Sequence, residues 1–105
     1  MATGTIKVRA KATGGVTEVK ALITHPMETG SRKDKKTGEL IPAHFIQEVA
    51  CTLKDQTVMT AHWGGTVSTN PYLAFKFSGA EPGDEITLKW SDNKGDSDSE
   101  TAAIS

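Results

Sequence analysis

Cysteine is almost absent from this sequence, with Cys51 the only one among 105 residues. A single thiol excludes an internal disulfide and any zinc site that needs two or more cysteine ligands. An excess of basic charge is also missing, because twelve Lys and Arg residues are set against thirteen Asp and Glu residues, for a formal charge of −1. Nucleic-acid-binding domains normally have a basic balance, so the composition argues against a nucleic-acid partner.

Long hydrophobic runs are missing as well. The N-terminal residues 1–15 contain no apolar stretch of the length that a signal peptide needs, and no segment approaches the length of a membrane span. We therefore expect no leader sequence and no membrane partner. Taken alone, this pattern favours a cytoplasmic protein.

No window shows convincing helical periodicity. Instead, apolar and polar residues alternate in short runs with turn signals every 8–12 residues, the pattern of half-buried strands. About seven strands are expected, beginning at Ile6, Val16, Phe45, Thr57, Tyr72, Ile86 and Asp96. This pattern predicts one all-β domain over residues 1–105, an immunoglobulin- or fibronectin-like β-sandwich. If compact, it would have a radius of gyration of about 13 Å.

Alternation also predicts which residues of the third strand face the core. Phe45, Val49, Cys51 and Leu53 share the inward face, and Ile46 falls on the opposite face. Near the sandwich surface, Leu22, Met59 and Trp63 are expected as outward-facing apolar groups through which a free chain could self-associate.

The alternation stops after Thr24, and a long hairpin excursion is expected at residues 24–41. His25 precedes a proline, which favours extended backbone. Gly30 and Gly38 flank a basic segment, and the chain re-enters the fold at residues 41–45. Because a structureless loop of this length is uncommon in a compact domain, we predict a hairpin with its tip near residues 34–38.

Two metal sites are worth testing against the sequence. A blue-copper site needs two His, one Cys and a distant Met, most of them close together on one loop, and the spacing of Cys51, Met59 and His62 does not form such a loop. A histidine-only zinc site of His25, His44 and His62 stays open, although the three belong to separate elements. Isolated loop and strand-end histidines are the favoured interpretation. We therefore expect neither a metal nor a cofactor.

Catalytic constellations are not evident. Cys51 shares its face with Val49 and Leu53, where a free cysteine behaves as a small hydrophobe rather than as a nucleophile. No carboxylate pair or Ser/His/Asp spacing indicates hydrolysis. The basic residues of the hairpin tip could attract an acidic partner or could simply be solvated: Arg32, Lys33, Lys35 and Lys36. The sequence predicts a protein that is not an enzyme.

Four segments resemble the SoxZ family: residues 24–46 (THPMETGSRKDKKTGELIPAHFI), 51–58 (CTLKDQTV), 68–77 (STNPYLAFKF) and 86–95 (ITLKWSDNKG). SoxZ is one of two subunits of the sulfur carrier of bacterial thiosulfate oxidation. The resemblance implies an immunoglobulin-like sandwich that pairs with SoxY, whose C-terminal Gly-Gly-Cys arm carries the sulfur. It also implies transient docking to other Sox enzymes, and a periplasmic location reached by co-export with SoxY.

This chain ends without a Gly-Gly-Cys arm, so the resemblance does not assign the carrier cysteine here. We hypothesise that one sheet face and the hairpin excursion contact SoxY, with apolar groups at the centre and charges at the rim. The candidate contact residues are Met27, His44, Phe45, Pro71 and Tyr72, with Arg32, Lys33 and Lys35 at the rim. The alternatives are a sulfur-carrying or metal-binding redox sandwich that uses Cys51 or the histidines, and a general scaffold module.

Overall fold

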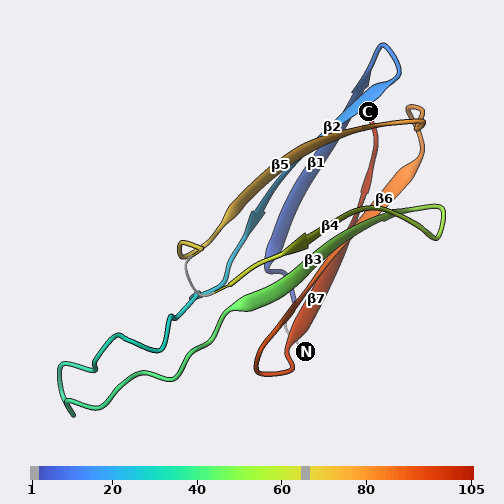
Figure 1. The fold of residues 1–105 in the computed structure, drawn as a ribbon. Coiled ribbons are helices and arrows are strands. Elements are labelled where there is room, and N and C mark those ends of the chain that lie inside the picture. Colours follow the sequence, from blue (N-terminus) through green and yellow to red (C-terminus); the bar gives the residue numbers. More distant parts are fainter. Residues whose placement is uncertain (1–2, 65–66) are drawn as a thin grey trace.

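The computed structural model describes residues 3–64 and 67–105 and has two facing antiparallel sheets (Figure 1). One sheet has the order β1-β2-β5 and consists of β1 (Ile6–Thr13), β2 (Val16–Ile23) and β5 (Tyr72–Ser78). The other has the order β4-β3-β6-β7 and consists of β3 (Ile46–Leu53), β4 (Gln56–His62), β6 (Glu85–Asp92) and β7 (Ser97–Ala103). The predicted all-β sandwich is therefore confirmed.

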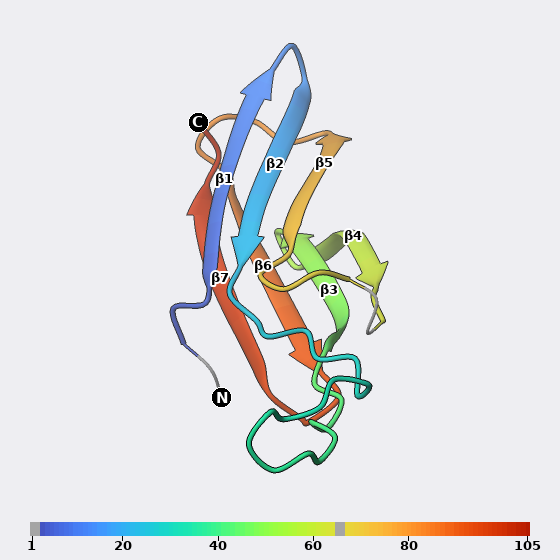
Figure 2. The same ribbon diagram turned by 90° about the vertical axis from the view of Figure 1, so that its left-hand side faces the viewer.

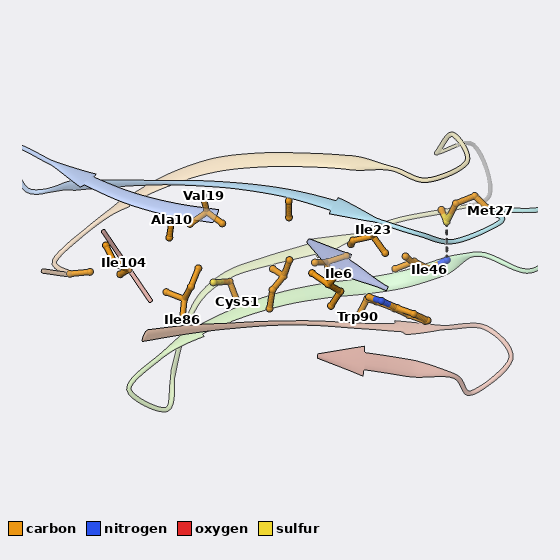
Figure 3. Packing of buried hydrophobic residues seen from close by; sticks show 14 residues of the cluster. Ile6, Ala10, Val19, Ile23, Met27, Ile46, Cys51, Ile86, Trp90 and Ile104 are labelled. Atoms are coloured by element: carbon orange, nitrogen blue, oxygen red, sulfur yellow. Dashed lines mark hydrogen bonds between the residues drawn. The ribbon is translucent and has the colours of Figure 1, made fainter. Parts of the chain in front are cut away.

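The core lies between the sheets and is built from alternate residues of each strand, as a side-chain period of two requires (Figure 3). Complete removal of a large apolar side chain from water contributes roughly 1.5–3 kcal/mol. The largest side chains buried in this way are Trp90, Ile23, Ile46, Ile86, Leu88, Val19 and Val49.

One core residue contradicts simple alternation. Ile46 was predicted to face outward, but it is fully buried together with Val49 and Cys51. The pairing of β3 with β6 shifts register between Ile46 and Glu48, which marks a β-bulge. The extra residue of a bulge reverses the direction of side chains on one side of it, so Ile46 turns to the core.

The two sheets are joined along one side. The polar run from Asp96 to Ser105 favours one continuous strand, but β7 ends at Ala103, and the next two residues cross to β1. Ile104 forms a parallel bridge with Ala10, and the Ala12 and Ser105 amides donate to Ser105 O and Ala10 O at 2.9 and 3.0 Å. β4 and β5 are the outermost strands on the other side.

Surface apolar groups were predicted correctly in one case of three. Leu22 is 42% exposed on the outer face of β2. Met59 and Trp63 are partly buried against the core instead of facing outward. The sequence also favours a short strand at residues 66–68; residue 66 lies outside the described residues, and residues 67 and 68 are not in a strand.

The β2–β3 excursion, residues 24–45, projects from one end of the sandwich (Figures 1 and 2). The molecule measures 54 × 22 × 20 Å, and its radius of gyration is 15.6 Å rather than the 13 Å expected for a compact chain. Lys33 and Leu40 form an antiparallel bridge, and the Gly38 amide donates to Asp34 O at 2.8 Å. The predicted hairpin tip is thus confirmed. The described residues contain no helix that could span a membrane.

Candidate functional site

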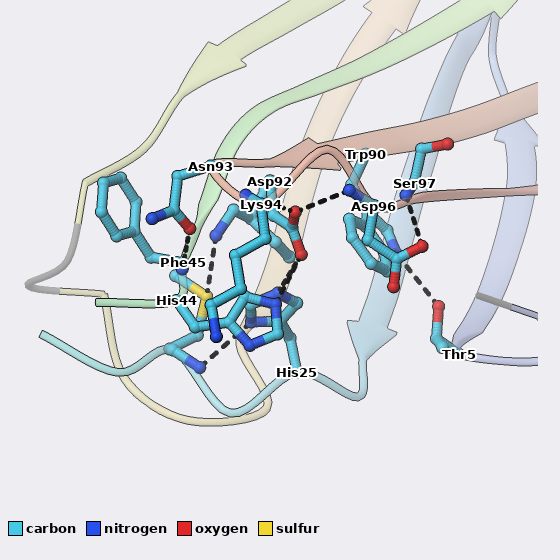
Figure 4. A network of polar contacts seen from close by, with 12 residues as sticks. Thr5, His25, His44, Phe45, Trp90, Asp92, Asn93, Lys94, Asp96 and Ser97 are labelled. Atoms are coloured by element: carbon cyan, nitrogen blue, oxygen red, sulfur yellow. Dashed lines mark hydrogen bonds and ion pairs between the residues drawn. The ribbon is translucent and has the colours of Figure 1, made fainter. Parts of the chain in front are cut away.

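Two histidines and one aspartate meet at the base of the excursion, and we call them the His–Asp cluster: His25, His44 and Asp92 (Figure 4). His25 follows the end of β2, His44 precedes β3, and Asp92 is the last residue of β6. Nε2 of His25 lies 3.0 Å and Nε2 of His44 lies 2.7 Å from the same carboxylate oxygen, Asp92 Oδ2. The sequence-based expectation of isolated histidines is therefore wrong for these two.

Hydrogen bonds define the tautomer of His25. The Met27 amide donates to His25 Nδ1 at 3.0 Å, so that nitrogen must present a lone pair. A neutral imidazole has its proton on the other nitrogen, and His25 therefore donates from Nε2–H to the Asp92 carboxylate. Met27 has a φ of 50°, which is uncommon for a residue other than glycine, so the chain bends at the residue whose amide contacts the ring.

The second oxygen of Asp92 closes the β6–β7 turn. Asp92 Oδ1 accepts from the Lys94 amide at 3.0 Å and from the Asp96 amide at 2.9 Å. Its side chain is fully buried. Burial raises the pKa of Asp92, but hydrogen bonds from His25, the Asp96 amide, His44 and the Lys94 amide outweigh burial, so the net pKa is lowered. The carboxylate is therefore ionised and holds two segments at once.

A second buried aspartate continues the network into β7. The Trp90 indole donates to Thr5 Oγ1 at 3.0 Å, and the Thr5 hydroxyl donates in turn to Asp98 Oδ2 at 2.6 Å. Burial raises the pKa of Asp98, but hydrogen bonds from Thr5 and from the Ser99 amide lower it overall. The His25 ring contacts the Trp90 ring edge-on, with centroids 5.2 Å apart, so the hydrogen-bond networks of Asp92 and Asp98 are in contact.

Two asparagines clamp the ends of the excursion. The side-chain oxygen of Asn70 accepts a hydrogen bond from the His25 backbone amide at 3.0 Å, and the Asn70 backbone amide donates to His25 O at 2.9 Å. Asn93 accepts the Phe45 amide at 2.8 Å and donates its side-chain amide to Ala43 O at 2.9 Å. Because both strands of the hairpin are fixed to neighbouring loops, its base forms a rigid junction.

The geometry of the His–Asp cluster does not suit a metal ion, although its ligand atoms lie within 4.8 Å of one another. A metal bound at His25 Nε2 would displace the proton to Nδ1, where the Met27 amide already donates. His62, the third member of the sequence-predicted zinc set, is 78% exposed in its side chain and lies near Glu48 instead. The cluster is a hydrogen-bonded structural centre.

Cys51 offers no reactive thiol. It is fully buried in β3, and burial raises its pKa to about 11. Roughly one thiol in ten thousand would then be ionised at pH 7, whereas nucleophilic or metal-binding chemistry needs the thiolate. The prediction of a core cysteine agrees with this position.

The predicted contact residues are divided between core and surface. Met27 and Pro71 are buried, and Met27 Sδ accepts the Ile46 amide at 3.4 Å. We place no contact surface on these two. His44 and Phe45 are half-buried beside the clamp.

The remaining predicted residues are exposed. Tyr72 is 61% exposed on β5. Arg32 forms an ion pair with Glu28 at 2.6 Å; the hydrogen bond from Arg32 lowers the pKa of Glu28. Lys33 and Lys35 are exposed on the hairpin and form no ion pair within the described part of the chain. Lys36 is likewise exposed and forms no ion pair among the described residues, so the tip has three free lysines.

The sequence pattern does not single out Asp92, Asn70 or Asn93 as site residues. A partial signal exists for Asp92, because an aspartate immediately before Asn-Lys-Gly favours a turn in which its side chain accepts backbone amides. No spacing in the sequence indicates that the same carboxylate also meets two histidines from another loop.

Together, the sandwich, the clamped excursion and the buried thiol define a small all-β domain that holds a projecting hairpin in a fixed position. The chain belongs to the SoxZ family: the family model described as "Sulphur oxidation protein SoxZ" matches residues 6–103. The earlier resemblance is thereby confirmed, and with it an involvement in sulfur oxidation as part of a Sox complex. No curated protein matches the chain.

Proposed function

We propose that the chain is the non-catalytic subunit of a periplasmic SoxYZ sulfur carrier, paired with SoxY. The observation that supports this most directly is the burial of Cys51 in a protein of sulfur oxidation. Since the one thiol of the chain is sealed in the core, a different polypeptide must hold the sulfur. In this role the chain anchors SoxY and helps present the SoxY arm to Sox enzymes.

The rigid base of the excursion supports an anchoring role. A flexible carrier arm is presented to several enzymes most effectively when its support keeps a fixed shape, because ordering a disordered support would cost conformational entropy at every docking event. The His–Asp cluster and the two asparagine clamps fix both strands of the hairpin. Binding surfaces on this end of the molecule are therefore preorganised.

Four residues that are exposed or half-buried at this end of the molecule are our proposed contacts. Phe45 and Tyr72 supply apolar area, and aromatic groups are enriched at the centres of protein interfaces. Lys33 and Lys35 extend on the hairpin tip, where rim charges mainly affect the rate of association. Changing Phe45 or Tyr72 to Ala should therefore raise the dissociation rate of SoxY, and changing the two lysines should lower the association rate.

Sulfur transfer by Cys51 itself is the competing function. It would require the two sheets to separate, because the thiol is fully buried in the core between them and its pKa is raised to about 11. No feature among residues 3–64 and 67–105 favours this route.

Co-expression with SoxY from the same host tests the proposal. Native mass spectrometry should show a one-to-one complex, and intact masses of the separated subunits should show sulfur adducts on SoxY alone. A Cys51→Ala variant is the matched control and should support the same adducts. Adducts on this chain that disappear in Cys51→Ala would refute the anchoring role, as would the absence of any complex.

A further inference from the structure

The two sheets of the sandwich differ in charge. β1, β2 and β5 contain Lys and Arg at five positions and one carboxylate, for a sum of +4, whereas β3, β4, β6 and β7 contain five carboxylates and one lysine, for a sum of −4. The near-neutral total thus conceals one strongly basic sheet. The cations of that sheet are Lys7, Arg9, Lys11, Lys20 and Lys76.

All five cations lie on the outer face of the sheet, which we call the basic face. Their neighbours in β1 and β2 at the alternate positions, such as Ala10 and Val19, are buried, and the cations are exposed. Pairing places Lys7 opposite Leu22, Arg9 opposite Lys20 and Lys11 opposite Glu18. The basic face is therefore a regular grid of side chains rather than a random surface.

The charges of this grid are only partly neutralised. Glu18 lies 3.4 Å from the Lys20 ammonium and 3.9 Å from that of Lys76. Lys7, Arg9 and Lys11 form no ion pair with any carboxylate among residues 3–64 and 67–105. Three unpaired cations consequently run in a line along β1.

The basic face is also hollowed. A depression of about 520 Å³ is lined by Lys7, Arg9, Lys20, Leu22 and Tyr72, with Glu100 of β7 also in its wall. Two others, of about 470 and 280 Å³, continue along the same face beside Lys11. Apolar surface from Leu22 and Tyr72, which are opposite one another in the β2–β5 pairing, closes one end.

We propose that the basic face binds an extended acidic segment of a partner protein. Alternate residues of a strand are about 6.6–6.8 Å apart on one face, so Lys7, Arg9 and Lys11 form a ladder of that spacing. An extended peptide with carboxylates at every second residue has the same repeat and meets each cation in turn. Leu22 and Tyr72 then accept an apolar residue at one end of the segment.

A protein segment fits this face better than a phosphate-rich surface. Glu18 lies in the middle of the grid, where it repels phosphates of a membrane or nucleic acid but can face a small neutral residue of an alternating peptide. The apolar end formed by Leu22 and Tyr72 likewise matches a polypeptide. This recognition chemistry is independent of which subunit bears the sulfur.

Binding of a synthetic peptide tests the proposal directly. The probe is a peptide of about ten residues in which Glu alternates with Thr and which ends in Leu, and a version with Gln for Glu is the control. Amide chemical shifts of the whole chain are followed at physiological salt. Shifts should be confined to β1, β2 and β5, and the Gln peptide should cause none.

Two triple variants of equal charge change locate the effect. Lys7→Gln/Arg9→Gln/Lys11→Gln should weaken peptide binding by roughly tenfold, since each exposed ion pair contributes a modest amount. Lys33→Gln/Lys35→Gln/Lys36→Gln on the hairpin is the matched control and should change it by less than about twofold, because screening limits charges beyond about 8 Å.

Several results would overturn the proposal. Equal weakening by both triple variants would mean that only the overall charge matters, and shifts outside β1, β2 and β5 would place binding elsewhere. Tighter association with vesicles of anionic phospholipid than with the peptide would identify a membrane instead. If sedimentation showed a dimer that the Lys7→Gln/Arg9→Gln/Lys11→Gln variant does not form, the occupant of the basic face would be a second copy of this chain.

Discussion

Nε2 of His25 lies 3.0 Å from Oδ2 of Asp92, although the two residues are 67 positions apart in the chain. This contact joins the start of the excursion to the last residue of β6. On the other side of the hairpin, Nε2 of His44 lies 2.7 Å from the same oxygen. One carboxylate therefore determines where both ends of a long insertion leave the sandwich.

Replacing Asp92 with Asn should destabilise the fold. Asp92 accepts two backbone amides on one oxygen and two imidazole N–H groups on the other, whereas an amide side chain has a single oxygen. One pair of donors would then face an NH₂ group, so we expect a loss of about 2–4 kcal/mol in the free energy of unfolding. Urea unfolding measures it, with exposed Asp55→Asn as the control. A loss no larger than that of the control would contradict the assigned role.

Stability should also depend on pH in the acidic range. The pKa values of Asp92 and Asp98 are lowered in the folded state, so their stabilisation is present above the unfolded-state value of about 3.9 and is lost as pH falls through the folded values. The free energy of unfolding should therefore decrease from about pH 5 downward. Carboxyl carbon NMR should give midpoints below about 3.9 for both residues. A midpoint at or above the value for exposed Asp55 would show that burial dominates instead.

Zinc should leave the His–Asp cluster unchanged. Nitrogen NMR of the imidazoles should show His25 protonated at Nε2, because the Met27 amide occupies Nδ1. An equimolar addition of zinc should not alter that pattern, whereas exposed His62 serves as an internal control for weak surface binding. Loss of the His25 Nε2 proton on adding zinc would show that the cluster is a metal site.

The Cys51 thiol should be unreactive in the folded protein. A thiol reagent should modify it at least about 100-fold more slowly than a cysteine placed at exposed position 57 on neighbouring β4, in a Cys51→Ala background. Urea should abolish the difference, because unfolding removes the burial that raises the pKa. Comparable modification rates for the two cysteines in the native state would favour sulfur transfer by this chain.

Much of the sandwich could be predicted because strand alternation is local information. The strand starts near Ile6, Val16, Tyr72 and Ile86 follow directly from apolar residues at every second position. The turn at Asp34–Gly38 was equally local, since glycine and polar residues favour it. Ile46 was misplaced because a bulge adds one residue to one strand only, and its cause lies in the pairing with β6.

The candidate site was less accessible to prediction. His25 and His44 were recognised as residues of interest, but their meeting at Asp92 depends on how β6 lies beside β3. The two asparagine clamps could not be predicted either, because the residues around Asn70 and Asn93 equally favour ordinary turns. Met27 is buried and has a positive φ, and nothing in its side chain requires that conformation.

The sequence positions of the His–Asp cluster also impose an order on folding. β1 and β2 pair through a short turn, and such local contacts form early, whereas both ends of the excursion are fixed together only when Asp92 arrives from near the end of the chain. During synthesis from the N-terminus, Asn70 can hold the His25 end first, but the His44 end stays unanchored to Asp92 and Asn93 until β6 and the turn after it have emerged. The excursion reaches its final direction as one of the last events of folding, together with closure of the sandwich by Ile104.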